Sequence, residues 1–330
     1  MHIVVLCGGL SPERDVSISS GHQIANALRN VGHDVQLLDL FFGNSLPCPS
    51  ACVVEQAPDL DEVRRQRPGN NENLIGPGVF EQCRTADIVF IALHGEDGEN
   101  GRLQAAFDLA EIRYTGTGYF GSTLAMNKGI SRVLFQAAGI NVANGFILNR
   151  SEQRSSAYNF PVVIKPASGG SSIATTIVRV HTELQPALNA VFAIDNEALV
   201  EDFIEGREFS VGVLGNKALP VIEICPTTEF FDYQAKYQGY TTETCPAETD
   251  AEIADEMQRL ALLAHKTLHL DVYSRTDFML SKQNEIFCLE SNTLPGMTPM
   301  SLLPQEASEI GLDFTALCQE IINLSMKRYL

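Results

Sequence analysis

This sequence lacks a long hydrophobic run, since none of its 330 residues lies in an apolar stretch of the roughly 18 residues that a membrane-spanning helix needs. The first six residues have no basic lead and soon meet Gly8 and Gly9, so we expect no secretory signal. Basic residues are scarce, with 23 Lys and Arg against 41 Asp and Glu and a net charge of −18. Such a chain repels nucleic acid and anionic membranes, and we expect a cytoplasmic protein that binds neither.

Cysteine motifs and zinc motifs are also missing. The eight cysteines are scattered and form no CxxC pair, so we expect free thiols. His265 and His269 lie four residues apart on an expected helix, but the sequence offers no third ligand beside them. A packing role is therefore favoured over zinc binding.

Two common nucleotide-binding motifs are excluded. No GxxxxGK[ST] occurs, which rules out a P-loop. Residues 116–121, GTGYFG, match GxGxxG, but no acid falls between Glu111 and Glu152 to hold a ribose. This stretch is therefore interpreted as a tight turn between a strand and a helix.

The composition is that of a folded chain rather than a disordered or collagen-like one. Hydrophobic residues make up 45% and charged residues 19%, which is ample for packed cores. At roughly 150 residues per domain, the length suggests two domains or three small ones.

Apolar runs alternate with helical patterns, which predicts an α/β fold that opens β-loop-α-β. Residues 43–78 break this pattern with five prolines, and a loop-rich excursion with a short helix near 60–66 is expected there. Strands are expected at 2–7, 33–40, 87–93, 112–114, 146–148, 162–165, 175–180, 198–202, 208–214, 219–224, 273–280 and 286–289. Helices are expected at 17–30, 103–110, 127–138, 251–268 and 314–328.

A flexible loop follows the buried strand that ends at Lys165. The loop, PASGGSS, holds two glycines and three serines, and is rich in hydroxyl and backbone N–H donors. Such a loop can close over phosphates, with Lys165 as a point charge. An ordinary polar surface loop remains the alternative interpretation of this segment.

A hairpin near the C-terminus carries the sharpest chemical pattern. Glu290 and Asn292 are two residues apart on one strand and face the same side, and Arg275 and Asp277 do so on the preceding strand. Two carboxylates and an amide supply the oxygen ligands that Mg²⁺ prefers, with Arg275 as a fixed cation beside them. An exposed hairpin with an ion pair is the alternative.

Two further loops follow predicted strands, where open α/β sheets bind ligands. The first, SPERDVS, contains Glu13, whose carboxylate suits an ammonium group; the alternative is a helix cap formed by Ser17. The second starts at His94 and has three glycines, which let the backbone approach a ligand.

These motifs occur together and in order, and the chain closely resembles the D-alanine–D-alanine ligases of the ATP-grasp superfamily. The resemblance spans roughly residues 3–304. It rests on the stretches GGLSPERDVS, ALHGEDGENGRLQ, YTGTGYFGSTLAMNK, VVIKPASGGSS, EDFIEGREFSVGVLG, FDYQAKY and SRTDFMLSKQNEIFCLESNTLPGMTPMSLLP.

The resemblance implies an ATP-grasp fold of three α/β domains, with ATP held between the second and third. On this sequence they are an N-terminal substrate domain (1–123), a central ATP-grasp subdomain (124–203) and a C-terminal ATP-grasp and metal-binding domain (204–330). The family also suggests a homodimer formed through the first domain.

The resemblance further implies roles for individual residues. Asp277, Glu290 and Asn292 would bind Mg²⁺, two ions in the family, with Mn²⁺ as a possible replacement. Nucleotide contacts would come from Lys128, Lys165, Ser172, Glu201, Phe203 and Glu208. The reaction would be served by Glu13, Ser171, Tyr237 and Arg275, and the amino acids would also meet His94, Lys236, Ser301 and Leu302.

The expected activity is ATP-dependent formation of D-alanyl-D-alanine through an acyl phosphate, as a precursor of peptidoglycan. Departures such as Asn127, where the family commonly has Asp, lie near the loops that close on substrate. A paralogous ligase of a secondary pathway, for instance one using a mycosporine-type acceptor, is therefore an alternative, and a non-catalytic nucleotide-binding regulator is another. Tyr237 matches the peptide-forming type, because ester-forming relatives carry His there.

Overall fold

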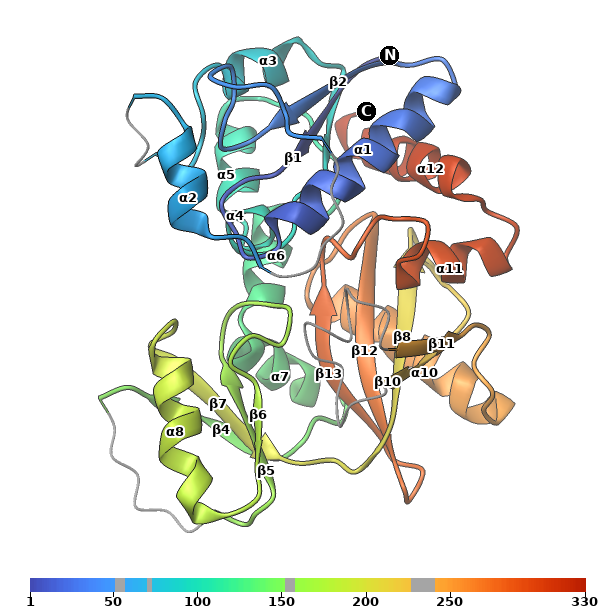
Figure 1. Cartoon of the computed structure of the whole chain (residues 1–330). Coiled ribbons are helices and arrows are strands. Elements are labelled where there is room, and N and C mark those ends of the chain that lie inside the picture. The colour runs from blue at the N-terminus through green and yellow to red at the C-terminus, as the bar shows by residue number, and fades with distance from the viewer. Residues whose placement is uncertain (51–56, 70–72, 152–157, 227–240) are drawn as a thin grey trace.

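The computed structural model describes residues 1–50, 57–69, 73–151, 158–226 and 241–330. Three separate sheets organise these residues, and helices pack around them (Figure 1). The predicted α/β class is confirmed. Within the described ranges, no helix is long and apolar enough to cross a membrane.

The first sheet is parallel and has the strand order β2-β1-β3. Strands β1 and β3 are almost wholly buried, as expected of a parallel sheet covered on both faces, and the edge strand β2 is partly buried. Helix α1 packs on β1 and β2 and also contacts α12 near the C-terminus (Figure 1). The elements are β1 (His2–Cys7), α1 (Arg14–Asn30), β2 (Asp34–Asp39), β3 (Ile88–Ile91) and α12 (Phe314–Met326).

The predicted excursion at residues 43–78 contains α2 (Leu60–Gln66), at the bounds expected from the sequence. Asp59 begins this helix, because its side chain accepts hydrogen bonds from the backbone N–H groups of Asp61 and Glu62. Residues 51–56 and 70–72 of the excursion lie outside the described part. Helix α3 (Val79–Thr85) then leads into β3.

The predicted strand at 112–114 is wrong in extent. Only an isolated parallel bridge joins Tyr114 to Val89 of β3. The backbone N–H and carbonyl of Tyr114 pair instead with side chains near the C-terminus. The N–H donates to the Tyr329 hydroxyl, and the carbonyl accepts from Arg328. The sheet therefore stops at this position.

Four short helices connect the first sheet to the second. They are α4 (Glu96–Glu99), α5 (Arg102–Leu109), α6 (Tyr119–Met126) and α7 (Lys128–Ala137). Gly116, at φ +86°, and Gly118 form the predicted tight turn before α6. Asn127 precedes α7 and its side chain accepts from the N–H of Ile130, so the residue found in place of Asp still works as a helix cap.

The second sheet is antiparallel and has the order β4-β7-β5-β6. Helix α8 packs against it, and the two share a small core of their own that includes Ile164 and Val191. The elements are β4 (Gly145–Asn149), β5 (Val162–Pro166), β6 (Thr176–Val178), α8 (His181–Phe192) and β7 (Glu197–Asp202).

The third sheet has the order β11-β10-β8-β12-β13, with β9 paired to β8. The strand predicted at 219–224 is shifted, because β8 pairs with the short β9 first and β10 starts only at Ile222. The strands are β8 (Gly206–Leu214), β9 (Lys217–Ala218), β10 (Ile222–Pro226), β11 (Thr241–Thr244), β12 (Tyr273–Ser281) and β13 (Ile286–Asn292). The helices are α10 (Ala251–Thr267), α11 (Leu302–Glu309) and the 3-10 turn η1 (Lys327–Tyr329).

The hydrophobic cores do not each belong to a single sheet. Residues of β1 and β3 share a core with Tyr273 and Leu294 of the third region and with α12. Phe135 of α7 packs with the third sheet, beside Phe209 and Phe278. The first and third sheets are thus joined by continuous packing, and the second sheet stands on its own.

His265 and His269, for which a packing role was favoured over zinc binding, lie in different settings. His265 is buried within α10 and its Nδ1 lies 2.7 Å from the Ser274 hydroxyl, a packing role. His269 lies beyond the end of the helix at φ +54°. The seven cysteines in the described ranges are free thiols.

Candidate active site

A cavity of about 650 Å³ lies between the second and third sheets. Its walls come from β5, β6 and β7 on one side and from β8, β10, β12 and β13 on the other. The structure brings nine of the predicted site residues to this cavity: Glu13, Lys128, Lys165, Ser172, Glu201, Phe203, Glu208, Asp277 and Glu290.

The chain crosses from β7 to β8 at the edge of this cavity. Glu201 is near the end of β7, Phe203 follows it, and Glu208 lies in β8. Apolar side chains of Met279 and Leu289 line the same cavity. An apolar slot beside a carboxylate and the polar backbone of a connecting segment suits a flat heterocycle joined to a sugar.

Two lysines bring positive charge to the cavity, beside Glu201 and Glu290. Lys165 is 9% exposed, and its Nζ lies 2.5 Å from Oε1 of Glu201. Burial disfavours its charge, but Glu201 and Glu290 outweigh burial and raise the pKa of Lys165, so it stays cationic. Lys128 starts α7, and its Nζ lies 3.1 Å from Oε2 of Glu290.

The PASGGSS loop is hydrogen-bonded to Lys128. The Lys128 ammonium donates to the carbonyl of Gly169 at 2.5 Å, and its backbone N–H donates to the carbonyl of Ala167. Ser171 and Ser172 both have positive φ, at +53° and +55°, which L-residues rarely adopt. Such local strain is commonly held at ligand-binding loops.

The predicted hairpin face is confirmed. Asp277 stands opposite Glu290, and Arg275 opposite Asn292, in the ladder of β12 and β13. The register shifts directly after Asp277, and such bulges are frequent beside active sites. The Arg275 guanidinium donates to both carboxylate oxygens of Asp277, at 2.9 and 2.7 Å. The Asn292 amide also donates to the Asp277 carboxylate, at 3.1 Å.

The chemistry of this face fits a hard divalent cation. Asp277 and Glu290 supply carboxylates from adjacent strands, and the amide of Asn292 supplies a neutral oxygen. In the ranges that the structure describes, no group of three or more His, Cys, Asp or Glu side chains could by itself hold a metal ion. A ligand with phosphate oxygens would complete the coordination, as is usual for Mg²⁺.

Ser210 was missed by the sequence reasoning. It is fully buried on β8, and its hydroxyl donates to Asp277 at 2.8 Å. The signal was available, because Ser210 lies two residues after Glu208 on a predicted strand and therefore shares its face.

Another residue missed is Glu306 of α11, which is fully buried on the same side of the sheet as the hairpin face. It accepts the N–H of Gly212, the register partner of Arg275 on β8, at 2.6 Å. A Cβ on Gly212 would lie 2.3 Å from this carboxyl oxygen, so glycine makes room for it. Burial raises the pKa of Glu306 well above its ordinary value.

A second corner adjoins the phosphate side. The hydroxyl of Ser171 donates to the carboxylate of Glu13, and both side chains are buried. Gly95 lies against this pair at φ +69°, and a Cβ there would come within 2.3 Å of Glu13 Oε2. The corner therefore brings together three loops: the one after β1, the one after β3 and the PASGGSS loop.

His94 and Glu99 connect this corner to the third region. His94 is held between the Ser20 hydroxyl, 2.9 Å from Nε2, and the Leu294 carbonyl, 3.0 Å from Nδ1. Burial lowers the pKa of His94, which favours a neutral ring with its proton on Nδ1. Contact of His94 with substrate stays a prediction.

No role was assigned to Glu99 from the sequence, although it lies in the turn after His94. It accepts the N–H of Gly95 at 2.8 Å and that of Leu294 at 3.1 Å. Burial, with the charge of Glu13, raises the pKa of Glu99 to about 8. Gly95 is a near neighbour in the chain, but Leu294 is 195 residues away, and no local pattern points to it.

The loop after β13 carries Ser301 and Leu302. The Ser301 hydroxyl contacts the hydroxyl and the N–H of Thr298, at 2.9 and 3.1 Å. Leu302 begins α11, and its side chain packs with Ile222 and Ile224 of β10. Its backbone N–H belongs to a first helical turn, which leaves such groups for ligands. Lys236 and Tyr237 lie outside the described residues.

Comparisons with known proteins point to one family. The family model "D-ala D-ala ligase N-terminus" matches residues 2–117, and "D-ala D-ala ligase C-terminus" matches residues 134–323. The D-alanine–D-alanine ligase of Lacticaseibacillus casei strain BL23 is 41% identical over 100% of this chain and 97% of its own length. That of Nitratidesulfovibrio vulgaris strain DP4 is 41% identical, over 99% and 98%.

Solved structures lead to the same family. A Bacillus anthracis D-alanine–D-alanine ligase complexed with ATP superposes with a TM-score of 0.80 at 29% identity, covering 99% of this chain and 98% of its own. The VanG D-Ala:D-Ser ligase of Enterococcus faecalis gives 0.77 at 27%, covering 98% and 99%. The predicted family and ATP-grasp fold are confirmed: the chain belongs to the D-alanine–D-alanine ligase family of ATP-dependent, ADP-forming ligases.

Proposed function

We propose that this protein joins two molecules of D-alanine into D-alanyl-D-alanine for peptidoglycan synthesis, with ATP converted to ADP and phosphate. The observation that carries the proposal is one continuous site. The hairpin acids and two lysines face a nucleotide-sized cavity, and the Glu13–Ser171 pair adjoins them. Relatives named as D-alanine–D-alanine ligases, about 40% identical over the whole chain, support this substrate.

The reaction needs positive charge at the phosphates. Lys128 and Lys165 would contact the phosphate oxygens, with Ser172 of the PASGGSS loop beside them, and Arg275 would stabilise the phosphoryl group during transfer. Asp277, Glu290 and Asn292 would hold Mg²⁺, two ions by family resemblance, with Mn²⁺ as a substitute. When bound, the metal neutralises charge on the phosphate oxygens.

The adenosine end of the nucleotide would occupy the crossing from β7 to β8. Glu201 and Phe203 would bracket the adenine, and Glu208 would hold the ribose hydroxyls. Apolar walls and a carboxylate at this end of the cavity support the assignment.

The two amino acids would lie at the Glu13 corner. Glu13, oriented by Ser171, would hold the ammonium group of the first amino acid, and His94 would lie beside it. Ser301 and the N–H of Leu302 would receive the carboxylate of the second. The carboxylate of the first amino acid attacks the γ-phosphorus, ADP leaves, and the amine of the second displaces phosphate from the acyl phosphate.

Three further assignments accompany this proposal. Domain boundaries after residues 123 and 203 and a homodimer formed through the first domain come from the family resemblance, and a cytoplasmic location comes from the composition. Sedimentation of the purified protein at several concentrations tests the dimer.

Phosphate release, measured with single amino acids and pairs and combined with product mass, tests the substrate. We expect D-alanine alone to give one phosphate and one ADP per dipeptide. D-Serine is the informative competitor, because a structural relative is named for it. A preferred non-amino-acid acceptor would support the secondary-pathway alternative, and nucleotide binding without turnover would support a regulator.

Oxygen labelling tests the intermediate. With ¹⁸O in the carboxylate of D-alanine, the acyl-phosphate route transfers label into the released phosphate. An adenylate route would instead label AMP, and the appearance of AMP would exclude the mechanism proposed here.

A further inference from the structure

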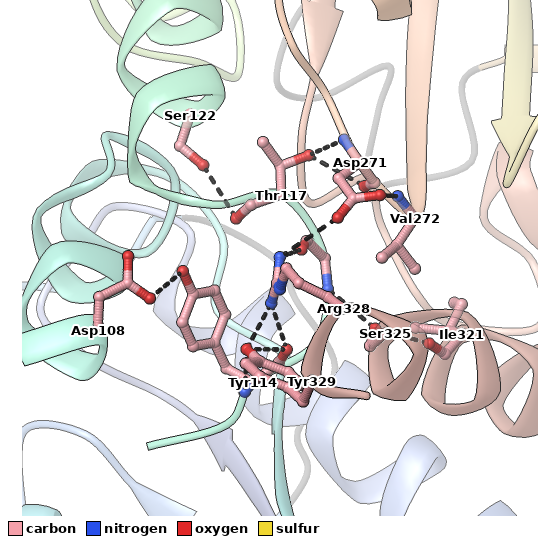
Figure 2. A network of polar contacts seen from close by, with 11 residues as sticks. Asp108, Tyr114, Thr117, Ser122, Asp271, Val272, Ile321, Ser325, Arg328 and Tyr329 are labelled. Carbon is pink, nitrogen blue, oxygen red and sulfur yellow. Dashed lines mark hydrogen bonds and ion pairs between the residues drawn. The ribbon is translucent and has the colours of Figure 1, made fainter. Parts of the chain in front are cut away.

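The last residues of the chain form a cluster of contacts outside the cavity lining, which Figure 2 shows at close range. The guanidinium of Arg328 donates to the carbonyls of Gly116 and Tyr114, at 2.7 and 2.8 Å. It also lies 3.5 Å from the carboxylate of Asp271. We name these three residues, with Arg328 and Tyr329, the C-terminal clasp.

Arg328 is stacked as well as hydrogen-bonded. Its Cζ lies 4.6 Å from the ring centroid of Tyr114 and 4.9 Å from that of Tyr329. The Tyr329 hydroxyl accepts the N–H of Tyr114 at 3.0 Å, and Tyr114 itself is 1% exposed. The planar guanidinium of Arg328 donates to two carbonyls and contacts two aromatic rings at once. A lysine ammonium cannot reproduce this geometry.

A second row of contacts fixes the same segment. The hydroxyl of Thr117 donates to the carbonyl of Asp271 at 3.1 Å and accepts its N–H at 3.0 Å. The N–H of Gly116 donates to Ser325 of α12 at 3.3 Å. Figure 2 shows these side chains converging from α12, from the turn before α6 and from the start of β12.

Both sides of the clasp continue into the active site. Tyr114 bridges β3 at Val89, and β3 runs on towards His94 in the loop beside Glu13. Asp271 lies just before β12, the strand that carries Arg275. The clasp therefore fixes two segments that lead to different sides of the proposed reaction centre: β3 leads to the His94 loop, and Asp271 leads into the start of β12, where Arg275 lies.

Resting on the proposed ligase function, we propose that Arg328 is a positioning residue for the amino-acid end of the reaction. By holding Tyr114 and Asp271 together, it sets the separation between the Glu13 corner and Arg275. A misplacement of about 1 Å caused by a remote change can cost about 100-fold in rate, so small rotations at the clasp matter.

The clasp predicts a selective defect. The nucleotide cavity lies between the second and third sheets, whereas the clasp joins the first sheet to the third. Loss of the clasp should therefore leave ATP binding intact. The acyl phosphate would meet a misplaced amine, and more of it would be lost to water.

The test compares Arg328→Ala and Arg328→Lys with Lys327→Ala, an exposed cation on the same turn. ATP affinity, kcat and KM for D-alanine, phosphate released per dipeptide, and Tm are measured on the full chain. For Arg328→Ala we expect kcat/KM for D-alanine to fall at least about tenfold, with ATP affinity within about twofold and phosphate in excess of dipeptide. Arg328→Lys should be intermediate, and Lys327→Ala should match wild type.

Other results would overturn the proposal or the function on which it rests. A lower Tm with unchanged kinetics and one phosphate per dipeptide would make the clasp merely structural and overturn the proposal. If Arg328→Ala does not fold, Tyr329→Phe and Arg328→Lys carry the test through the same phosphate-to-dipeptide ratio. A wild-type protein that makes no dipeptide from D-alanine would refute the proposed function itself, which is a separate outcome.

Discussion

Nζ of Lys128 lies 3.1 Å from Oε2 of Glu290, although the lysine begins α7 and the acid lies on β13. The pair joins the phosphate side of the cavity to the proposed metal face. A cation already balances the acid before any metal is considered, so the charges of this corner are matched in the protein alone.

The first prediction concerns Glu290→Gln, which removes one charge with little change in volume. We expect activity to fall by at least about 100-fold, because charge neutralisation at the phosphates is the main catalytic contribution. Tm should change little. Glu285→Gln, an exposed acid in the turn of the same hairpin, is the matched control and should keep full activity. Near-normal turnover of Glu290→Gln would remove this acid from the mechanism.

The second prediction concerns Gly95→Ala. A Cβ at residue 95 would lie 2.3 Å from Glu13 Oε2, so the carboxylate must move. KM for the first D-alanine should rise at least about tenfold, since misplacement of about 1 Å is costly. Gly139→Ala has a similar φ of +80° with no atom within 4 Å of the added Cβ, and isolates the backbone strain. Equal kinetics in the two variants would contradict the steric argument.

The third prediction concerns pH. The raised pKa of Glu99, about 8, means that the folded protein keeps a proton that the unfolded chain releases above its ordinary value of 4.5. This carboxyl therefore lowers the stability of the fold as pH rises from about 4.5 to about 8. Glu99→Gln cannot ionise, so its stability deficit relative to wild type should shrink between pH 5.5 and pH 8 in urea denaturation. A deficit that grows with pH would refute this.

The fourth prediction concerns the nucleophile and rests on the sequence, since Tyr237 lies outside the described residues. A neutral tyrosine hydroxyl, with an ordinary pKa of about 10, adds no charge near an incoming ammonium, whereas a histidine could become cationic. We expect amide rather than ester when D-alanine and D-lactate compete at neutral pH, and more amide as pH rises. Tyr237→Phe should lower turnover. Mostly ester product would show that Tyr237 does not select the nucleophile.

The parts of the site that are local in sequence could be predicted. The alternation of side chains on two adjoining strands places Arg275, Asp277, Glu290 and Asn292 on one face, and a short turn fixes their pairing. Glu99 could not be assigned in this way, because its partner Leu294 is 195 residues away.

The same reasoning explains the misplaced element. Residues 112–114 have a strand-like pattern, but the outer backbone groups of Tyr114 meet Arg328 and Tyr329 rather than another strand. Local propensity cannot report a partner at the other end of the chain, and tertiary contacts override it.

The shared core of the first sheet has a consequence for synthesis of the protein. Ile3 and Leu6 of β1 pack in one core with Leu317 and Ile321 of α12, the penultimate element of the chain. Domains usually fold in order as the ribosome makes them, with the N-terminal one first. Here the first sheet waits for almost the entire chain before its core is complete. Its earliest strands emerge first and are covered last, so their apolar side chains stay without this packing through most of translation.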